Sequence, residues 1–152
     1  MTARVLIPVL LDLTGLRILF VGGGTGARTK LASLVDQDPA VRIVAPEIDP
    51  EVEAFCSRLT DVEYHLRAFT EADLDGISLV YGFTDDPEVN AGLAELCRRR
   101  GLWSNIAQNR GPFSFTSPAI GRKDGVVAAF SSESGHPAVA VAVRDAWVEG
   151  EE

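Results

Sequence analysis

Short apolar runs alternate with segments of helical periodicity over the first two thirds of the chain. Strands are predicted at 17–21, 41–46, 62–69, 77–83 and 102–107. Between them, apolar residues recur at the three- and four-residue spacing of a helix face. Helices are predicted at 26–36, 49–59 and 85–101, with a short helical turn at 70–76. This alternation indicates an α/β fold with a Rossmann-type parallel sheet and crossover helices.

Two of the predicted helices carry clear start and stop signals. Asp49 is an N-cap candidate before Pro50, and acidic residues follow in the first turn. The segment 85–101 has a proline near its start, three arginines in its last turn and Gly101 after them. These features favour a helix because caps and opposite charges satisfy the free backbone groups at helix ends.

The pattern changes after residue 107, where glycine and proline become frequent. Short β-type runs are predicted at 115–120 and 126–131, and the small-residue segment 137–147 reads as a helix or, alternatively, as a strand. These elements do not continue the preceding strand and helix units. We therefore expect a first domain with the Rossmann-type sheet over 1–112 and an appended C-terminal β/helical segment over 113–152.

The composition is that of a globular protein with an acidic balance. The chain has 152 residues, enough for a real core, and a formal net charge of −8. Nucleic acid is not an expected partner, because phosphate binding needs a concentrated basic face. No apolar run reaches the ~18 residues of a membrane helix and no signal peptide is visible, so we expect a cytoplasmic protein without membrane association. Cys56 and Cys97 form no metal-ligand pattern, and no metal site is predicted.

The stretch "RILFVGGGTGARTKLASLV" holds the strongest candidate for chemistry. Gly22, Gly24 and Ala27 fit the dinucleotide fingerprint G-x-G-x-x-[G/A], directly after a strand and at the start of a helix. The first glycine allows a tight turn, the second lets the backbone touch a pyrophosphate, and the small third residue allows close packing of helix and strand. The helix N-terminus offers free N–H groups to the phosphates. The alternative is a glycine turn that binds another ligand or none.

A carboxylate at the end of the next strand extends this pattern. Glu47 lies about 20 residues past the motif, where an acid can accept a hydrogen bond from a ribose 2′-hydroxyl and repels a 2′-phosphate. The sequence therefore favours NAD over NADP as the cofactor.

Five stretches together resemble one enzyme family over nearly the whole chain. They are "IPVLLDLTGLRILFVGGGTGARTK", "VRIVAPEIDPEV", "LVYGFTDDPEVN", "GLWSNIA" and "FTSPAIGRKDGVVAAFSSESGHPAVAVAVRD". The chain resembles the precorrin-2 dehydrogenase family, the N-terminal part of siroheme synthases, whose members often also act as sirohydrochlorin ferrochelatases. The resemblance implies NAD-dependent oxidation of precorrin-2 to sirohydrochlorin. It also implies a homodimer in which the C-terminal segment serves dimerisation and borders the tetrapyrrole.

The resemblance also suggests which residues form the site. It implies cofactor contacts at Gly22, Gly23, Gly24, Thr25, Gly26, Glu47, Ile48, Thr84, Asp85 and Asn105. It implies substrate-side positions at Gln108 and Ser132. Glu133 and His136 are further catalytic candidates because of their own chemistry: the carboxylate could replace the one that Gln108 lacks, and the imidazole could act as a proton carrier. Plain capping by Asp85 and Asp86, a surface Glu133 and a solvated His136 are the alternatives.

The chain departs from the family pattern at three places. Gln108 stands where the family has the aspartate proposed as its acid/base, and an amide cannot exchange a proton near pH 7. Glu133 and His136 stand where the family has small polar residues. The chain also ends near residue 152, where family members usually continue into further helices.

These departures leave two main hypotheses open. The first is a precorrin-2 dehydrogenase with doubtful ferrochelatase activity. The second is a degenerate, non-catalytic member that binds NAD or a tetrapyrrole as a partner subunit. A third is another small NAD-dependent oxidoreductase without affinity for tetrapyrroles.

Overall fold

The computed structural model describes residues 6–107, 114–132 and 136–150. The chain divides into two compact units. We call Leu13–Thr116 the sheet unit, and Met1–Asp12 together with Ser117–Glu152 the hairpin unit. The residues before Leu13 thus belong to the hairpin unit, whereas the sequence analysis assigned them to the first domain, 1–112.

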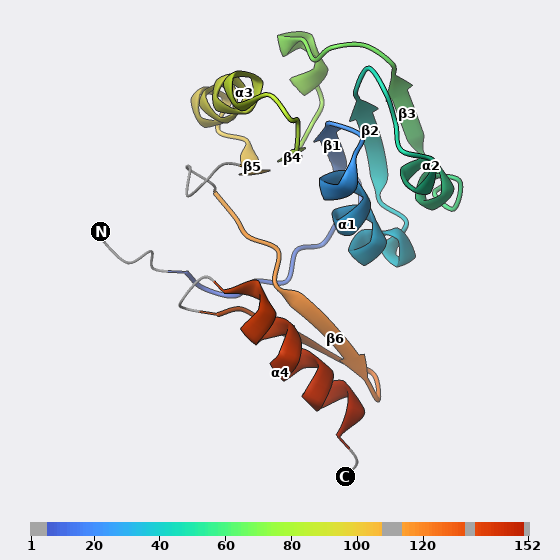
Figure 1. Ribbon diagram of the computed structural model, residues 1–152, viewed down its shortest axis with the longest axis vertical. Helices are drawn as coiled ribbons and strands as arrows, with labels where there is room; N and C mark the ends of the chain where they lie inside the picture. The colour runs from blue at the N-terminus through green and yellow to red at the C-terminus, as the bar shows by residue number, and fades with distance from the viewer. Residues whose placement is uncertain (1–5, 108–113, 133–135, 151–152) are drawn as a thin grey trace. The chain divides into compact units, whose positions relative to one another are not determined.

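A five-stranded parallel sheet forms the centre of the sheet unit (Figure 1). Its strands are β1 (Arg17–Val21), β2 (Ala40–Val44), β3 (Val62–His65), β4 (Leu79–Gly82) and β5 (Trp103–Ile106). Their order is β3-β2-β1-β4-β5, with every pair parallel. This confirms the Rossmann-type α/β fold. The strand order reverses between β1 and β4, which is where open sheets of this kind bind ligands.

Helices cover both faces of the sheet. Residues of α1 (Thr25–Leu34) and α2 (Pro50–Cys56) share one apolar cluster with Phe20, Ile43 and Tyr81. Residues of α3 (Pro87–Arg100) share the other cluster with Leu19 and Val80. Because successive strand residues point to opposite faces, one apolar run supplies both clusters.

The predicted helix caps are present. The side chain of Asp49 accepts a hydrogen bond from the N–H of Glu51 at the start of α2, and Asp86 accepts from Glu88 and Val89 at the start of α3. Gly101 ends α3 with a φ of 66°, a left-handed conformation that glycine adopts without strain.

Two short 3-10 helices complete the sheet unit: η1 (Val35–Gln37) and η2 (Glu71–Leu74). The helix predicted over 26–36 therefore ends as α1 at Leu34 and continues as η1, and the turn predicted over 70–76 is η2. The strand predicted over 62–69 is shorter than expected, because Arg67 and Thr70 turn away from the sheet to bond Asp73.

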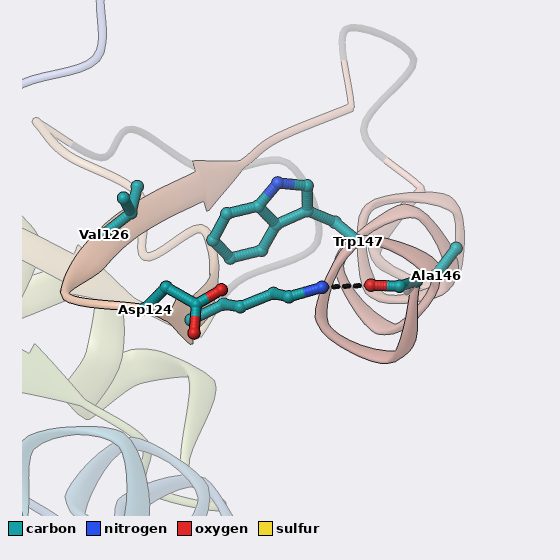
Figure 2. Close-up of a pocket in the computed structure, with 6 residues that line it drawn as sticks. Asp124, Val126, Ala146 and Trp147 are labelled. Atoms are coloured by element: carbon teal, nitrogen blue, oxygen red, sulfur yellow. Dashed lines mark hydrogen bonds between the residues drawn. The ribbon is translucent and has the colours of Figure 1, made fainter. Parts of the chain in front are cut away.

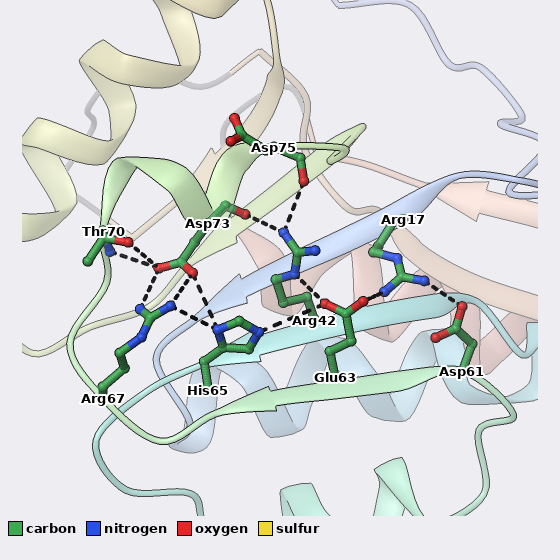
Figure 3. Close-up of polar contacts among 9 residues, drawn as sticks. All are labelled: Arg17, Arg42, Asp61, Glu63, His65, Arg67, Thr70, Asp73 and Asp75. Carbon is green, nitrogen blue, oxygen red and sulfur yellow. Dashed lines mark hydrogen bonds and ion pairs between the residues drawn. The ribbon is translucent and has the colours of Figure 1, made fainter.

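Alternating charges tie the β3 edge to the rest of the sheet (Figure 3). Glu63 on β3 accepts hydrogen bonds from Arg42 on β2, at 2.6 Å, and from Arg17 on β1. Arg17 also reaches Asp61 at 2.6 Å, and Arg42 donates to the backbone carbonyl of Asp73 at 2.9 Å. The arginines therefore connect three neighbouring strands and η2.

Asp73 is the buried carboxylate of this network. Its side chain is 2% exposed and accepts two hydrogen bonds from Arg67, at 2.7 and 2.8 Å, and one from the backbone N–H of Thr70 at 2.8 Å. His65 Nδ1 lies 3.6 Å from the same carboxylate. The bonds from Arg67 and Thr70 lower the pKa of Asp73 to about 2.

The hairpin unit consists of β6 (Ala119–Lys123), β7 (Val126–Phe130) and α4 (Pro137–Glu149). The two strands pair antiparallel around Asp124 and Gly125, both with positive φ. The strand predicted over 115–120 is wrong in position, because Ser114 bonds the backbone of Ser104 at the edge of β5 and β6 begins only at Ala119. The segment 137–147 is a helix, which decides between its two alternatives.

Trp147 joins α4 to the hairpin (Figure 2). Its ring lies against Gly121 so closely that a Cβ there would be 3.0 Å from the indole, and its centroid is 5.9 Å from that of Phe130. Lys123 donates a hydrogen bond to the carbonyl of Gly150 after the end of α4. A cation at this position stabilises the free carbonyls of a helix end.

We predict that Asp73→Asn destabilises the protein in a pH-dependent way. The folded-state pKa of Asp73 is below its unfolded value of 3.8, so the stabilisation is fully present above pH ~4 and is lost as the pH falls toward 2. The shift corresponds to about 2 kcal/mol. Urea unfolding should show that difference from wild type at pH 7 and about a third of it at pH 2.5, where the folded carboxylate is still partly ionised.

The control for this experiment is Glu95→Gln, which removes an exposed carboxylate paired with Arg98 on α3. We expect a much smaller change there, because exposed ion pairs contribute little. An equal effect of Asp73→Asn at both pH values would contradict the assignment of the stabilisation to the ionised carboxylate.

Candidate functional site

The loop after β1 is pressed against the loop after β4. Gly22 has a φ of 104°, and a Cβ on it would lie 2.6 Å from the carbonyl oxygen of Phe83. The N–H of Phe83 donates to the carbonyl of Val21 at 2.8 Å. Only glycine fits such a turn with backbone at that distance. The backbones of the β1 and β4 loops are therefore in direct contact where the strand order reverses.

The loop after β2 is clamped to the same glycines. A Cβ on Gly23 would lie 2.5 Å from the carbonyl oxygen of Glu47 and 3.0 Å from Cα of Ile48. The N–H of Asp49 donates to the carbonyl of Gly23 at 2.9 Å. The predicted residues Gly23, Glu47 and Ile48 are thus in direct contact.

Gly24 and Thr25 differ from the two glycines before them. A Cβ on Gly24 would meet no atom within 4 Å, so this backbone faces open space. Thr25 begins α1, where no side chain caps the helix and no acidic residue lies in the first turn. In contrast, α2 and α3 each have a side-chain cap and an acidic residue in the first turn. The N–H groups at the start of α1 are left for an anion, as a pyrophosphate site requires.

Gly26 and Ala27 allow α1 to approach the sheet. A Cβ on Gly26 would lie 2.6 Å from Cβ of Phe83, and Ala27 is fully buried against the sheet. The residues of the fingerprint therefore play distinct parts: Gly22, Gly23 and Gly26 permit close packing, whereas Gly24 leaves a surface open. This open backbone is the feature that fits a dinucleotide.

Glu47 is exposed, three residues after the end of β2. Its backbone is fixed by the clamp on Gly23, while its carboxylate remains accessible to solvent. An acid at this place matches the residue that binds a ribose hydroxyl in dinucleotide sites.

Thr84 and Asp85 follow β4 at the other side of the crevice. Thr84 is partly buried and its backbone N lies 3.1 Å from the position of a Cβ on Gly22. Asp85 is exposed, and the cap of α3 is Asp86. Capping therefore explains Asp86 and does not explain Asp85.

Asn105 lies on β5 in register with Tyr81 of β4. Tyr81 stacks on Phe20 and Phe83 with centroid distances of 5.1 and 6.0 Å, and it meets Phe115 edge-on at 5.3 Å. An aromatic wall thus continues from the core of the sheet unit to the loop that carries Thr84.

The structure describes two of the four catalytic candidates, Ser132 and His136. Ser132 Oγ accepts a hydrogen bond from the N–H of His136 at 3.3 Å, which places these two residues together at the start of α4. His136 is exposed at the N-cap position. Gln108 and Glu133 lie outside the described residues.

Asn90 and Phe83 are site residues that the sequence analysis did not single out. Asn90 is a buried polar residue of α3 whose side chain bonds Thr84. A signal for it exists in "TDDPEVN", because an asparagine on the inner face of an amphipathic helix needs partners. Phe83 gave no signal, since its role depends on the approach of Gly22 and Gly26.

Other reactive groups do not form a second site. Burial raises the pKa of the Cys56 thiol and raises that of Cys97 to about 11, so neither is a thiolate at neutral pH. Among the described residues, no cluster of three His, Cys, Asp or Glu side chains is arranged to hold a metal ion. None of the described helices has the length and apolar character needed to cross a bilayer.

Comparison with known proteins identifies the family of this fold. Residues 9–119, well over half of the chain, match a family model described as "Putative NAD(P)-binding". The chain belongs to this NAD(P)-binding family. The match includes the glycine loop, Glu47 and Thr84, and it confirms the expectation of a nicotinamide dinucleotide cofactor.

Curated relatives of this NAD(P)-binding protein are siroheme synthases. One from Pseudomonas entomophila (strain L48) is 35% identical over 145 residues, which are 93% of this chain and 31% of the relative. One from Chromobacterium violaceum is 32% identical over 137 residues, which are 90% of this chain and 29% of the relative. The chain therefore spans about a third of the length of the curated relatives it matches.

A solved structure shares the fold. "SirC, precorrin-2 dehydrogenase" superposes with a TM-score of 0.78 at 21% identity, covering 97% of this chain and 72% of that one. The likeness confirms the architecture of the Rossmann-type sheet with the added hairpin and helix.

We predict opposite consequences for alanine at two neighbouring glycines. Gly23→Ala pushes a Cβ into the Glu47 backbone and should lower the free energy of unfolding by about 1–3 kcal/mol. Gly24→Ala meets open space and should cost about 1 kcal/mol or less. It should nevertheless weaken NADH binding about tenfold or more, because its Cβ stands where the backbone meets the pyrophosphate.

Thermal unfolding and NADH fluorescence titration separate the two effects. If Gly24→Ala binds NADH as tightly as the wild type, the dinucleotide does not lie on this loop.

Proposed function

We propose that this protein is an NAD-dependent dehydrogenase that oxidises precorrin-2 to sirohydrochlorin in siroheme biosynthesis. The observation that carries the proposal is the open backbone at Gly24 and the uncapped start of α1, placed where the strand order reverses and beside Glu47. Siroheme synthases among the relatives and the fold of a precorrin-2 dehydrogenase support the substrate.

The cofactor in this proposal is NAD. Its pyrophosphate would lie on the glycine loop Gly22–Gly26, at the N–H groups that begin α1. Its ribose would contact Glu47, whose charge disfavours a 2′-phosphate. Ile48, Thr84, Asp85 and Asn105 would border the rest of the cofactor. The nicotinamide, when bound, supplies the hydride acceptor for the oxidation. The protein's own residues hold the substrate in line with it and exclude water.

Gln108 separates the two activities of the family. It directly follows Ala107 at the end of β5 and offers an amide where the family has a carboxylate. An amide can orient a substrate by hydrogen bonds but cannot take up its proton. Dehydrogenation can transfer that proton to water, whereas metal insertion loses its acid/base, so we propose a dehydrogenase without effective ferrochelatase activity.

Ser132, Glu133 and His136 form the proposed substrate side. The bond between Ser132 and the backbone of His136 supports this, because it orients the segment at the start of α4. The imidazole is exposed, and its two ring nitrogens can donate or accept hydrogen bonds. The competing function is a degenerate member that binds NAD or tetrapyrrole without turnover, and Gln108 is the observation that favours it.

The hairpin unit supports a homodimer. Of its described residues, only Gly121 and Ala140 are buried. The first two turns of α4, from Pro137 to Val143, are nevertheless apolar around their circumference, and a helix surface of this kind is normally covered. The large exposed apolar residues of the unit are Leu6, Ile7, Val9, Leu10, Leu11, Val126, Val127, Val139, Val141, Val143 and Val148.

The charged residues of the hairpin unit are compatible with a second copy of this chain as the partner. The charges of its described residues nearly cancel, with the cations Arg122, Lys123 and Arg144 against the carboxylates Asp12, Asp124, Asp145 and Glu149. A two-fold interface places the same patch against itself, so a balanced apolar patch can self-associate where the net charge of −8 on the whole chain would oppose it. A cytoplasmic setting completes the proposal and agrees with the two free, buried cysteines.

We expect the wild-type protein to form NADH from NAD and precorrin-2 generated in situ without oxygen. NADP should support less turnover because of Glu47. Gln108→Asp should keep this activity and gain cobalt or iron insertion into sirohydrochlorin, measured by the change in the absorbance spectrum. Gly24→Ala is the matched negative control, since it should fold and lose cofactor affinity.

The outcomes separate the hypotheses. Turnover only in Gln108→Asp would mean a site that has lost its acid/base and would contradict an active wild type. Absence of turnover in both, with NADH still bound, would favour the non-catalytic partner subunit.

We also expect a dimer by sedimentation equilibrium. The double variant Val139→Glu/Val143→Glu adds two charges to one face of α4 and should give a monomer. Leu66→Glu, an exposed apolar residue of the sheet unit, should leave the dimer unchanged. A monomeric wild type would overturn the proposed interface.

A further inference from the structure

Asn90 is a buried polar side chain that the function proposed above does not use. It lies in the first turns of α3 and is 3% exposed. The start of α3 does not need it, since Asp86 already accepts from the N–H groups of Glu88 and Val89 at 2.8 and 3.3 Å. Burying an amide is costly unless its hydrogen bonds are satisfied, so its partners indicate what it does.

The partners of Asn90 are the ends of two neighbouring strands. Its Oδ1 accepts from the N–H of Thr84 at 3.2 Å and from the Thr84 hydroxyl at 2.7 Å. Its Nδ2 donates to the carbonyl of Thr84 at 2.9 Å and to that of Ala107 at 3.1 Å. These partners fix the orientation of the amide, because a rotated side chain would face two carbonyls with an oxygen.

Thr84 is therefore held from two directions. On one side, the Phe83 carbonyl abuts Gly22 and the Phe83 N–H bonds Val21. On the other side, Asn90 bonds both backbone groups and the hydroxyl of Thr84. The same amide holds Ala107, which is bonded through its N–H to the carbonyl of Gly82 at 2.7 Å. Asn90 thus sets the spacing between the ends of β4 and β5.

We propose that Asn90 is a positioning residue for the nicotinamide half of the cofactor, acting through Thr84 and Ala107. This inference rests on the proposed function, because it requires the dinucleotide to lie against the loop after β4. Asn90 itself touches neither cofactor nor substrate. Its effect is to keep the Thr84 loop at a fixed distance from the glycine loop and to fix the residue that precedes Gln108.

The test uses two variants of Asn90 and one matched control. Asn90→Asp keeps the size and one acceptor but replaces the donor with an oxygen that repels the carbonyls of Thr84 and Ala107. Asn90→Ala removes all four contacts. Cys97→Ala truncates a fully buried side chain seven residues later on α3, which belongs to the apolar cluster with Leu19 and Val80. It reports what a loss of packing on this helix does by itself.

We expect NADH titration to show a Kd raised about tenfold for both Asn90 variants and changed less than about twofold for Cys97→Ala, although all three unfold at lower temperature. In steady-state assays, KM for NAD should rise more than kcat falls. Thr84→Val, which removes only the hydroxyl, should weaken binding less than Asn90→Ala. In the Asn90→Ala background it should add less than it does alone, because the bond to Asn90 is already lost there and only the bond from the hydroxyl to the carbonyl of Asp86, at 3.0 Å, is left to remove.

Three results would overturn the inference. Asn90→Asp or Asn90→Ala that binds NADH as the wild type does would show that the loop needs no anchoring. An equal rise in Kd for Cys97→Ala would reduce the effect to general stability. Failure of both Asn90 variants to fold would make Asn90 a core residue without a positioning role. A wild type that binds no NADH would instead overturn the proposed function.

Discussion

The contact on which the structure depends is the approach of backbone to backbone at the point where the strand order reverses. Gly22 lies against the carbonyl of Phe83 and Gly23 against that of Glu47, at distances where a side chain cannot fit. Three loops from β1, β2 and β4 therefore meet around one glycine segment. Because this packing is dense on both sides, the open backbone of Gly24 is the exception. It is an open surface held by a rigid frame, which is what a preformed ligand site requires.

The polar residues of the sheet unit serve this frame at two places. At the β3 edge, Glu63 and Asp73 connect strands and η2 through arginines, in a region where the edge would otherwise be free. At the other end, Asn90 joins β4 to β5 beside the site. Both arrangements are satisfied hydrogen-bond networks. The first stabilises the fold, and the second fixes the geometry of the crevice.

The two units of the chain differ in how many apolar side chains they bury. The sheet unit has apolar clusters on both faces of its sheet and can be stable as it stands. Over its described residues, the hairpin unit has two strands, one helix and almost no buried side chain, and a lone hairpin of this kind is marginal in water. The dimer proposed above would cover such a surface.

The sequence by itself determined the alternation of strands and helices along the chain, the helix caps at Asp49 and Asp86, and the class of cofactor, because periodicity, capping and the glycine fingerprint are local signals. It placed the strand before Lys123 too early, since Ser114 bonds Ser104 through a contact between distant segments. Only the tertiary structure decided three other features. Gly23 is packed against backbone whereas Gly24 is open, Gly26 contacts Phe83, and Asn90 anchors Thr84. Each of these features depends on contact between segments that are far apart in the chain, and a local sequence pattern carries no information about such contacts.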